Sequence, residues 1–270
     1  MKIYVVCILY NNKISTIRSL MQILQLAETY PIEIFVEDNS REKFCQENNK
    51  EYEELYNGKI IYECNHANLG LSKAYNKAIS KMENDSWVML IDDDTNFSQE
   101  YLKNAFEAAM GKKSEVISGI VCCQKGYMSP TKRIMLRQGI KSNFVTEQGY
   151  YENIYCINSG LMYKISLIQK IGGYDENLFL DMVDYWFMEK LIEINKNKML
   201  IVQGKIRQSF SGVQINGFRA DLRRFKIFRK DFNYFCKVCN KSFFYKSITI
   251  IKRFLNIIIR NVLVKHFCNR

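Results

Sequence analysis

Short apolar runs alternate with segments of helical periodicity through the first 120 residues, and this alternation constrains the fold more than any other feature. Five apolar runs predict buried strands, at 2–9, 32–36, 59–62, 87–91 and 116–121. Three segments between them repeat apolar residues at helical spacing, at 15–26, 71–82 and 99–110. A β–α–β–α order of this kind implies an α/β fold, with a mainly parallel sheet and helices on both faces.

The sequence changes character after Gly217. Residues 201–270 hold 16 Lys and Arg against 2 Asp and Glu, whereas the whole chain carries a net charge of +11. Segment 218–239 interleaves basic and aromatic residues, and segment 247–264 is mostly Ile, Leu and Val. Its polar residues share one helical stripe, formed by Thr249, Lys252, Arg253, Asn256 and Arg260. We therefore expect a domain at 1–217 and a basic, aromatic-rich, amphipathic helical tail at 218–270.

Two locations are open for this tail. A basic amphipathic helix is typical of a segment that lies in a membrane interface, which predicts contact with the cytoplasmic membrane surface through 240–270. The alternative is a helix docked on the protein's own core or on a partner subunit, as in a homodimer.

Several features favour a cytoplasmic protein, bound peripherally to the inner face of the membrane. The first apolar run has no basic leader and no small-residue cleavage site, and no stretch is apolar enough to span a bilayer. The nine cysteines are scattered, and their odd number favours reduced thiols. Cys236 and Cys239 form a single pair without a nearby histidine, which we interpret as incidental rather than as a zinc site.

Polar residues follow three of the predicted strands. Asp38 comes after the second, Asn68 and Gly70 after the third, and the triplet 92–94 of three aspartates after the fourth. The carboxyl ends of parallel strands line the crevice where α/β sheets bind ligands, so a nucleotide-sized ligand is expected there. Adjacent carboxylates repel one another, and Mg²⁺ carrying phosphate would relieve this repulsion. A solvated acidic turn is the simpler alternative for the triplet alone.

A later pair of carboxylates lies at the start of a predicted helix. Asp181 and Asp184 are three residues apart and can share a face. Either could simply cap the helix at 185–194, because the helix dipole favours a carboxylate at that end.

Six short motifs now carry a resemblance to a known family. They are Leu9-Tyr10-Asn11, Glu37-Asp38-Asn39-Ser40, Asn68-Leu69-Gly70 with Ala74-Tyr75-Asn76, Ile91-Asp92-Asp93-Asp94-Thr95, Asn158-Ser159-Gly160-Leu161, and Gly172-Gly173-Tyr174-Asp175-Glu176. Their order over residues 1–235 resembles the family 2 glycosyltransferases of the GT-A type, nearest to the bacterial rhamnosyltransferase-like branch. The resemblance implies a GT-A, Rossmann-like fold.

The resemblance also implies roles for the residues at the strand ends. Asp94 would be the direct ligand of Mn²⁺ or Mg²⁺, with Asp92 assisting, and Asp93 would contact the ribose of a nucleotide-diphosphate sugar. The nucleotide pocket would be lined by Leu9, Asn11, Asp38, Asn68 and Gly70, with Asp38 accepting a hydrogen bond from the base ring. Asp184 would be the catalytic base, with Asp181 as the rival.

The chain departs from the family at two places. Val183 stands where many relatives have Glu, and no His follows the last predicted strand, at 199–202. Two residues are candidates to replace that His: Gln208 as a metal ligand, or Arg207 as a cation that neutralises phosphate directly.

The resemblance implies an inverting hexosyl- or rhamnosyltransferase that acts on a saccharide or lipid-linked acceptor in bacterial surface polysaccharide synthesis, with no nucleic-acid partner. A non-enzymatic membrane- or nucleic-acid-binding protein on the same scaffold is the alternative, but it would leave the acidic strand ends unexplained. A sugar nucleotidyltransferase needs a glycine-rich loop where the chain has Tyr10 to Lys13. A phosphatase of the Asp-x-Asp-x-Thr kind needs Thr at position 96, which is Asn.

Overall fold

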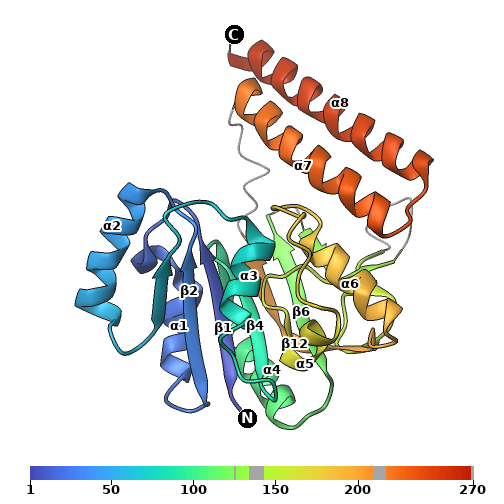
Figure 1. The fold of residues 1–270 in the computed structure, drawn as a ribbon. Helices are drawn as coiled ribbons and strands as arrows, with labels where there is room; N and C mark the ends of the chain where they lie inside the picture. Colours follow the sequence, from blue (N-terminus) through green and yellow to red (C-terminus); the bar gives the residue numbers. More distant parts are fainter. Residues whose placement is uncertain (125, 134–142, 209–216, 269–270) are drawn as a thin grey trace.

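A ten-stranded sheet forms the centre of the computed structural model, which describes residues 1–124, 126–133, 143–208 and 217–268 (Figure 1). Its strands are Ile3–Leu9 (β1), Ile32–Asp38 (β2), Ile61–Cys64 (β3), Trp87–Asp92 (β4), Thr95–Phe97 (β5), Val116–Cys123 (β6), Gly126–Ser129 (β7), Gly149–Tyr151 (β9), Met162–Lys164 (β11) and Met199–Gln208 (β12). The order is β3-β2-β1-β4-β11-β6-β12-β5, with β7 beside β6 and β9 beside β12. Thr131–Lys132 (β8) and Ile154–Tyr155 (β10) form a separate pair.

The first four strands are parallel and end at one edge of the sheet. Leu9 pairs with Asp38, Asp38 pairs with Cys64, and Ile8 pairs with Asp92. The register therefore brings the polar strand ends together, as the sequence predicts. β11 lies antiparallel between β4 and β6, so the sheet is mainly rather than wholly parallel.

Helices cover both faces of the sheet, which confirms the predicted α/β class. Their bounds are Arg18–Leu26 (α1), Glu42–Glu51 (α2), Leu71–Ile79 (α3), Gln99–Met110 (α4), Ile165–Lys170 (α5), Val183–Glu193 (α6), Phe218–Val238 (α7) and Phe243–Cys268 (α8), with a 3₁₀ turn at Ile14–Thr16 and a π-helical turn at Tyr52–Tyr56. Buried side chains of α1 and α4 pack with one face of the strands, and those of α3, α5 and α6 pack with the other.

The expectation that all cysteines are reduced thiols is wrong for one pair. Cys45 on α2 and Cys64 at the end of β3 form a disulfide. They are 19 residues apart in the sequence, and an argument from an odd cysteine count cannot detect a single pair that the fold brings together. Cys236 and Cys239 remain free thiols.

The segment predicted as a tail is a pair of helices, α7 and α8, which lie beyond the carboxyl ends of the central strands (Figure 1). Phe225, Phe228, Phe232 and Phe235 on α7 are buried in the same hydrophobic cluster as α3 and α6. Lys241, between the two helices, pairs with Glu189 of α6 at 2.6 Å. The helical pair is therefore anchored to the rest of the molecule.

The polar stripe predicted on α8 does not face outward as a whole. Arg253 lies over the ring of Phe228, and Arg260 pairs with Asp221 of α7 at 2.6 Å. The exposed surface of α8 is mainly apolar, with exposed side chains at Phe244, Ile248, Ile251, Leu255 and Ile259 beside exposed Lys252 and Asn256. No helix in the described part of the chain combines the length and the apolar character needed to cross a bilayer.

Candidate active site

Three elements converge on the aspartate triplet after β4. Asp92 accepts hydrogen bonds from Ser159 Oγ and from Gln208 Nε2, the latter at 3.0 Å. The same amide nitrogen of Gln208 lies 3.2 Å from Asp94 Oδ1. Gln208 is the last residue of β12, so the lengthening of this strand beyond its predicted end at residue 202 brings the amide to the carboxylates.

The carboxylates of this cluster resist ionisation. Burial raises the pKa of Asp92, and burial together with the charge of Asp92 raises the pKa of Asp94 to about 6. A cation placed between them would reverse both effects, because an opposite charge favours the ionised form. The cluster is therefore electrostatically suited to a positive ligand.

The donor atoms of the cluster fit a hard divalent cation. Asp92 and Asp94 offer carboxylate oxygens, and Gln208 Oε1 is buried with no hydrogen-bond partner among the described residues. Magnesium and manganese both prefer such oxygen ligands. Asp92 and Asp94, the predicted metal ligands, are therefore brought together beside the side-chain amide of Gln208, whose nitrogen faces both carboxylates.

A hollow of about 710 Å³ opens beside the triplet. Asp93 and Asp94 line it on one side, and Arg18, Lys205 and Arg207 bring positive charge to it. Burial and the neighbouring Asp92 raise the pKa of Asp93, which is also hydrogen-bonded by Asn12. A hollow that contains both a cation site and cationic side chains can accommodate a diphosphate.

Asp38 is the last residue of β2, which β1 separates from β4, and it is completely buried. Its oxygens accept hydrogen bonds from the backbone of Ser40, from Asn48 and from Tyr62, at 2.7–2.8 Å. Asp38 thus ties β2 to α2 and β3. Ser40 in turn accepts the backbone N–H of Asn11 through Oγ at 2.6 Å.

Asn68, Gly70 and Leu9 shape the same edge through the backbone. Asn68 Oδ1 accepts the N–H of Gly70 at 2.9 Å. Gly70 has φ 82°, and a Cβ there would lie 2.6 Å from the carbonyl oxygen of Phe179. The side chain of Leu9 is completely buried in the core, so only its backbone reaches the site, where its carbonyl accepts from Asn39.

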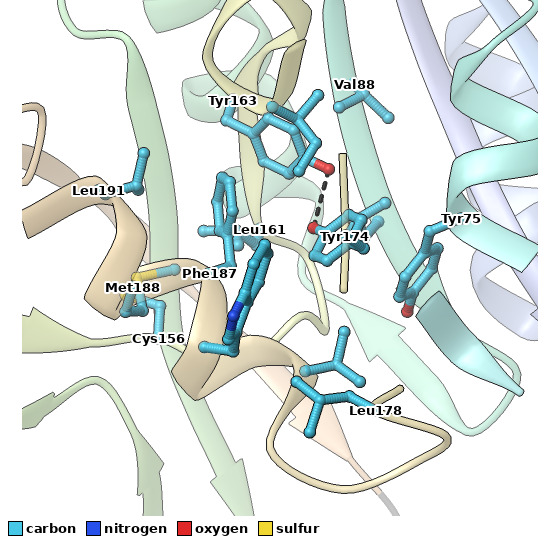
Figure 2. Packing of buried hydrophobic residues seen from close by; sticks show 14 of the residues in the cluster. Tyr75, Val88, Cys156, Leu161, Tyr163, Tyr174, Leu178, Phe187, Met188 and Leu191 are labelled. Atoms are coloured by element: carbon cyan, nitrogen blue, oxygen red, sulfur yellow. Dashed lines mark hydrogen bonds between the residues drawn. The ribbon is translucent and has the colours of Figure 1, made fainter. Parts of the chain in front are cut away.

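The Gly172-Gly173-Tyr174 motif is fixed against the sheet by Tyr174 (Figure 2). The hydroxyl groups of Tyr174 and Tyr163 lie 2.9 Å apart. Asn76 of α3 holds the backbone of Tyr174 from both sides, because its amide accepts from the N–H and donates to the carbonyl. This anchoring leads the chain into α6, which begins one residue before Asp184.

The two predicted base candidates have different surroundings. Asp181 makes a two-point ion pair with Arg224 of α7, with Nη2 to Oδ1 at 2.9 Å. The partly buried Asp184 accepts the N–H of Tyr185 at 2.8 Å and has no ion pair in the described part of the chain. Burial, with smaller contributions from Asp181 and Asp92, raises the pKa of Asp184 to about 7. A carboxylate with such a pKa can accept a proton near neutral pH.

Sequence reasoning assigned no role to several supporting residues. Asn48 and Tyr62 bind Asp38 from positions 10 and 24 residues further along the chain, and Arg18 lines the hollow beside the triplet. Ser159 belongs to a recognised motif, yet nothing in its spacing indicated that it binds Asp92. The strained backbone of Met182, with φ 66°, also became visible only in the structure.

Comparisons with known proteins agree with this geometry. Residues 4–172 match the model of the family Glycosyl transferase family 2. The chain belongs to this family. No curated protein sequence matches this glycosyltransferase family member.

Solved structures resemble the family 2 chain in fold. One is GalNAc-T7 with UDP, GalNAc and Mn²⁺, at TM-score 0.57 and 16% identity, covering 77% of this chain and 43% of GalNAc-T7. Another is S. aureus TarS, at TM-score 0.55 and 18% identity, covering 95% of this chain and 43% of TarS. TarS 1–349 in complex with UDP matches at TM-score 0.55 and 18% identity, over 86% of this chain and 64% of that one. The chain thus spans less than two thirds of each of these proteins, and the likeness shows a GT-A fold.

Proposed function

We propose that this chain is an inverting glycosyltransferase that moves a hexosyl or rhamnosyl group from a nucleotide-diphosphate donor to a saccharide or lipid-linked acceptor. One observation carries the proposal. The oxygen cluster of Asp92, Asp94 and Gln208 adjoins a cationic hollow, and Asp184 is close enough to interact electrostatically with Asp92. A metal-and-diphosphate site next to a carboxylate of raised pKa is what transfer from a nucleotide sugar requires.

Asp92, Asp94 and Gln208 would hold Mn²⁺ or Mg²⁺. When bound, the cation supplies Lewis-acid stabilisation of the negative charge that develops on the leaving diphosphate. Arg18 and Arg207 would neutralise the diphosphate further, since both line the same hollow. Asp93 would contact the ribose.

The nucleotide base would lie toward β1, β2 and α3. Asn11, Asp38 and Asn68 belong to this side of the edge, and the backbones of Leu9 and Gly70 give it its shape. Because Asp38 already accepts three hydrogen bonds, we assign it mainly the task of holding the base-side loop in place.

Asp184 would take the proton of the acceptor hydroxyl as that hydroxyl attacks the donor sugar. A single displacement of this kind inverts the anomeric carbon. Asp181 is the weaker candidate because its carboxylate is already paired with Arg224. We assign Asp181 the task of fixing the loop that leads to Asp184.

We also propose that the enzyme works in bacterial surface polysaccharide synthesis, at the cytoplasmic face of the membrane, with 240–270 in contact with lipid. The exposed apolar face of α8 supports this location. Replacing Ile248, Ile251 and Leu255 by Gln should abolish cosedimentation with anionic vesicles. The matched control replaces two exposed apolar residues elsewhere, Leu55 and Met110, and should cosediment like the unaltered chain. Equal cosedimentation of all three proteins would refute membrane contact through α8, and a change in oligomeric state would point to a homodimer instead.

A panel of nucleotide sugars, incubated with the protein and Mn²⁺ or Mg²⁺, tests the activity. We expect metal-dependent release of nucleoside diphosphate from one donor, and faster release when the acceptor is present. Release that is equal with and without metal for every donor would contradict the proposal.

A further inference from the structure

A second hollow, of about 660 Å³, lies between α7, the start of α3 and the loop at 175–180. We call it the α7 groove. It shares no lining residue with the hollow beside Asp93 and Asp94. Asn68 also lines the groove, which therefore adjoins the proposed base side of the donor site and not the hollow assigned to the donor diphosphate.

Three lysines from two distant parts of the sequence line the α7 groove. Lys73 comes from the first turn of α3, and Lys230 and Lys237 come from α7. Within the described residues, none of the three ammonium groups has a carboxylate partner. By contrast, Lys77, one turn further along α3, pairs with Glu37 and Glu63.

Few negative charges offset these lysines. Glu176 lines the groove, but it already accepts a hydrogen bond from Asn76 at 3.2 Å. Tyr234 and Asn233 add hydrogen-bonding groups on α7. The first turn of α3 adds the positive end of a helix dipole. The groove is thus a site for an anion with several oxygens, such as a phosphate or diphosphate.

Hydrogen bonds join the α7 wall of the groove to the loop that leads to Asp184. Tyr234 donates to Asp175 at 2.9 Å and accepts from Asn177 at 3.0 Å. A few residues further on, the N–H groups of Leu180 and Asp181 both donate to Asp231 of α7 at 2.8 Å. An anion in the groove would therefore be held in a fixed position relative to the loop that ends at Asp184.

We propose that the α7 groove binds the phosphate or diphosphate group of a lipid-linked acceptor. The inference rests on the proposed function and specifies its acceptor. Lys237 lies in the last turn of α7, six residues before the exposed Phe243 that begins α8. A lipid chain attached to the bound phosphate thus has a short path to the apolar face of α8.

Binding of a soluble, short-chain prenyl diphosphate to the full chain tests the groove. EDTA is present throughout, because the donor hollow then lacks the cation it needs for a diphosphate. The groove variant carries Lys73→Gln, Lys230→Gln and Lys237→Gln. The matched control carries Arg219→Gln, Arg223→Gln and Lys226→Gln, which remove the same charge from exposed positions of α7 outside the groove.

We expect the groove variant to bind the prenyl diphosphate about tenfold more weakly than the unaltered chain, and the control to bind it as the unaltered chain does. Equal affinity of both variants would overturn the proposal. A parallel measurement uses phosphatidylglycerol vesicles. If the groove lysines matter for vesicles and not for the prenyl diphosphate, the anion is a bilayer headgroup, and the acceptor assignment is overturned.

The result is independent of catalysis. Binding of the prenyl diphosphate in EDTA can be measured even if no nucleotide sugar is turned over. Failure of the proposed function would appear as absent donor turnover, whereas failure of this inference would appear as equal binding by the two variants. Conversely, metal-dependent hydrolysis of the donor should be unchanged in the groove variant, because the lysines do not line the donor hollow.

Discussion

The side-chain amide of Gln208 donates a hydrogen bond to Asp94, with 3.2 Å between Nε2 and Oδ1. Rotating this amide by half a turn would exchange its two terminal atoms and aim Oε1, which has no partner among the described residues, at the carboxylates. Replacing Gln208 by Ala should therefore raise the dissociation constant of Mn²⁺ about 10- to 100-fold. Electron paramagnetic resonance of free Mn²⁺ measures this constant. Gln203→Ala, at an exposed position of the same strand, is the control, and an equal effect at both positions would contradict a ligand role.

Asp94→Ala should lower metal-dependent donor turnover at least about a hundredfold, because it removes a charge from the proposed cation site. Initial rates over a range of Mn²⁺ concentrations give the comparison. Asp85→Ala removes an exposed carboxylate just before β4 and should leave the rate unchanged. Full metal dependence in the Asp94 variant would rule this residue out as a ligand.

Transfer should depend on pH through Asp184. Only the ionised carboxylate can take a proton, and its pKa is raised to about 7, so kcat/KM should rise with pH, reach half its maximum near pH 7 and level off above. Asp184→Asn should lower transfer about 10²- to 10⁴-fold while donor binding persists. Asp181→Asn should keep a profile that rises with pH, with its midpoint shifted slightly to lower pH, because the charge of Asp181 contributes to the raised pKa of Asp184. A normal profile in the Asp184 variant would refute the assignment.

Asp231 should be important for stability without touching substrate. It is completely buried, and one of its oxygens accepts the backbone N–H groups of Leu180 and Asp181, in the loop that leads to Asp184. Asp231→Ala leaves both donors unsatisfied, so the free energy of unfolding should fall by about 3 kcal/mol. Urea denaturation provides the measurement. Asn233→Ala, exposed on the same helix, should change it little, and similar losses at both positions would argue against this role.

A comparison of Gly70 with Gly58 separates two destabilising effects of an added side chain: backbone strain and steric clash. Both have positive φ, at 82° and 76°, so Ala strains the backbone at each by about 1–2 kcal/mol. At Gly70 a Cβ also lies 2.6 Å from the backbone oxygen of Phe179, whereas at Gly58 nothing lies within 4 Å. Gly70→Ala should thus lower the melting temperature more than Gly58→Ala, and should also weaken donor binding. Equal decreases in melting temperature would mean that the backbone at Phe179 moves away from the new Cβ without loss of stability.

The sequence predicts the helices and strands whose apolar residues repeat at a regular spacing. Helix 99–110 has the predicted bounds because its apolar spacing is regular and Ser98 caps it. The strand ends at Asp38 and Asp92 meet because parallel strands end at one edge. Helix α2, by contrast, was not predicted, since Glu42–Glu51 is mostly polar and is held by contacts with distant segments.

The residue pattern alone does not predict which side of α8 packs against the protein. Arg253 and Arg260 belong to the predicted polar stripe, yet they turn inward toward Phe228 and Asp221. A partly buried arginine is favoured where a partner is present, and these partners are 25 and 39 positions earlier in the chain. In the same way, the ion pair with Arg224, which distinguishes Asp181 from Asp184, joins residues 43 positions apart.

The hydrogen bonds from Leu180 and Asp181 to Asp231 limit where this chain can be truncated without loss of its folded structure. Composition changes at Gly217, and a chain shortened there would retain every strand and every residue of the oxygen cluster. It would nevertheless lose the helix that supports the loop before Asp184, along with four phenylalanines from the main core. Expression trials that stop at residue 217 should therefore yield a poorly folded product, and those that keep α7 a usable one.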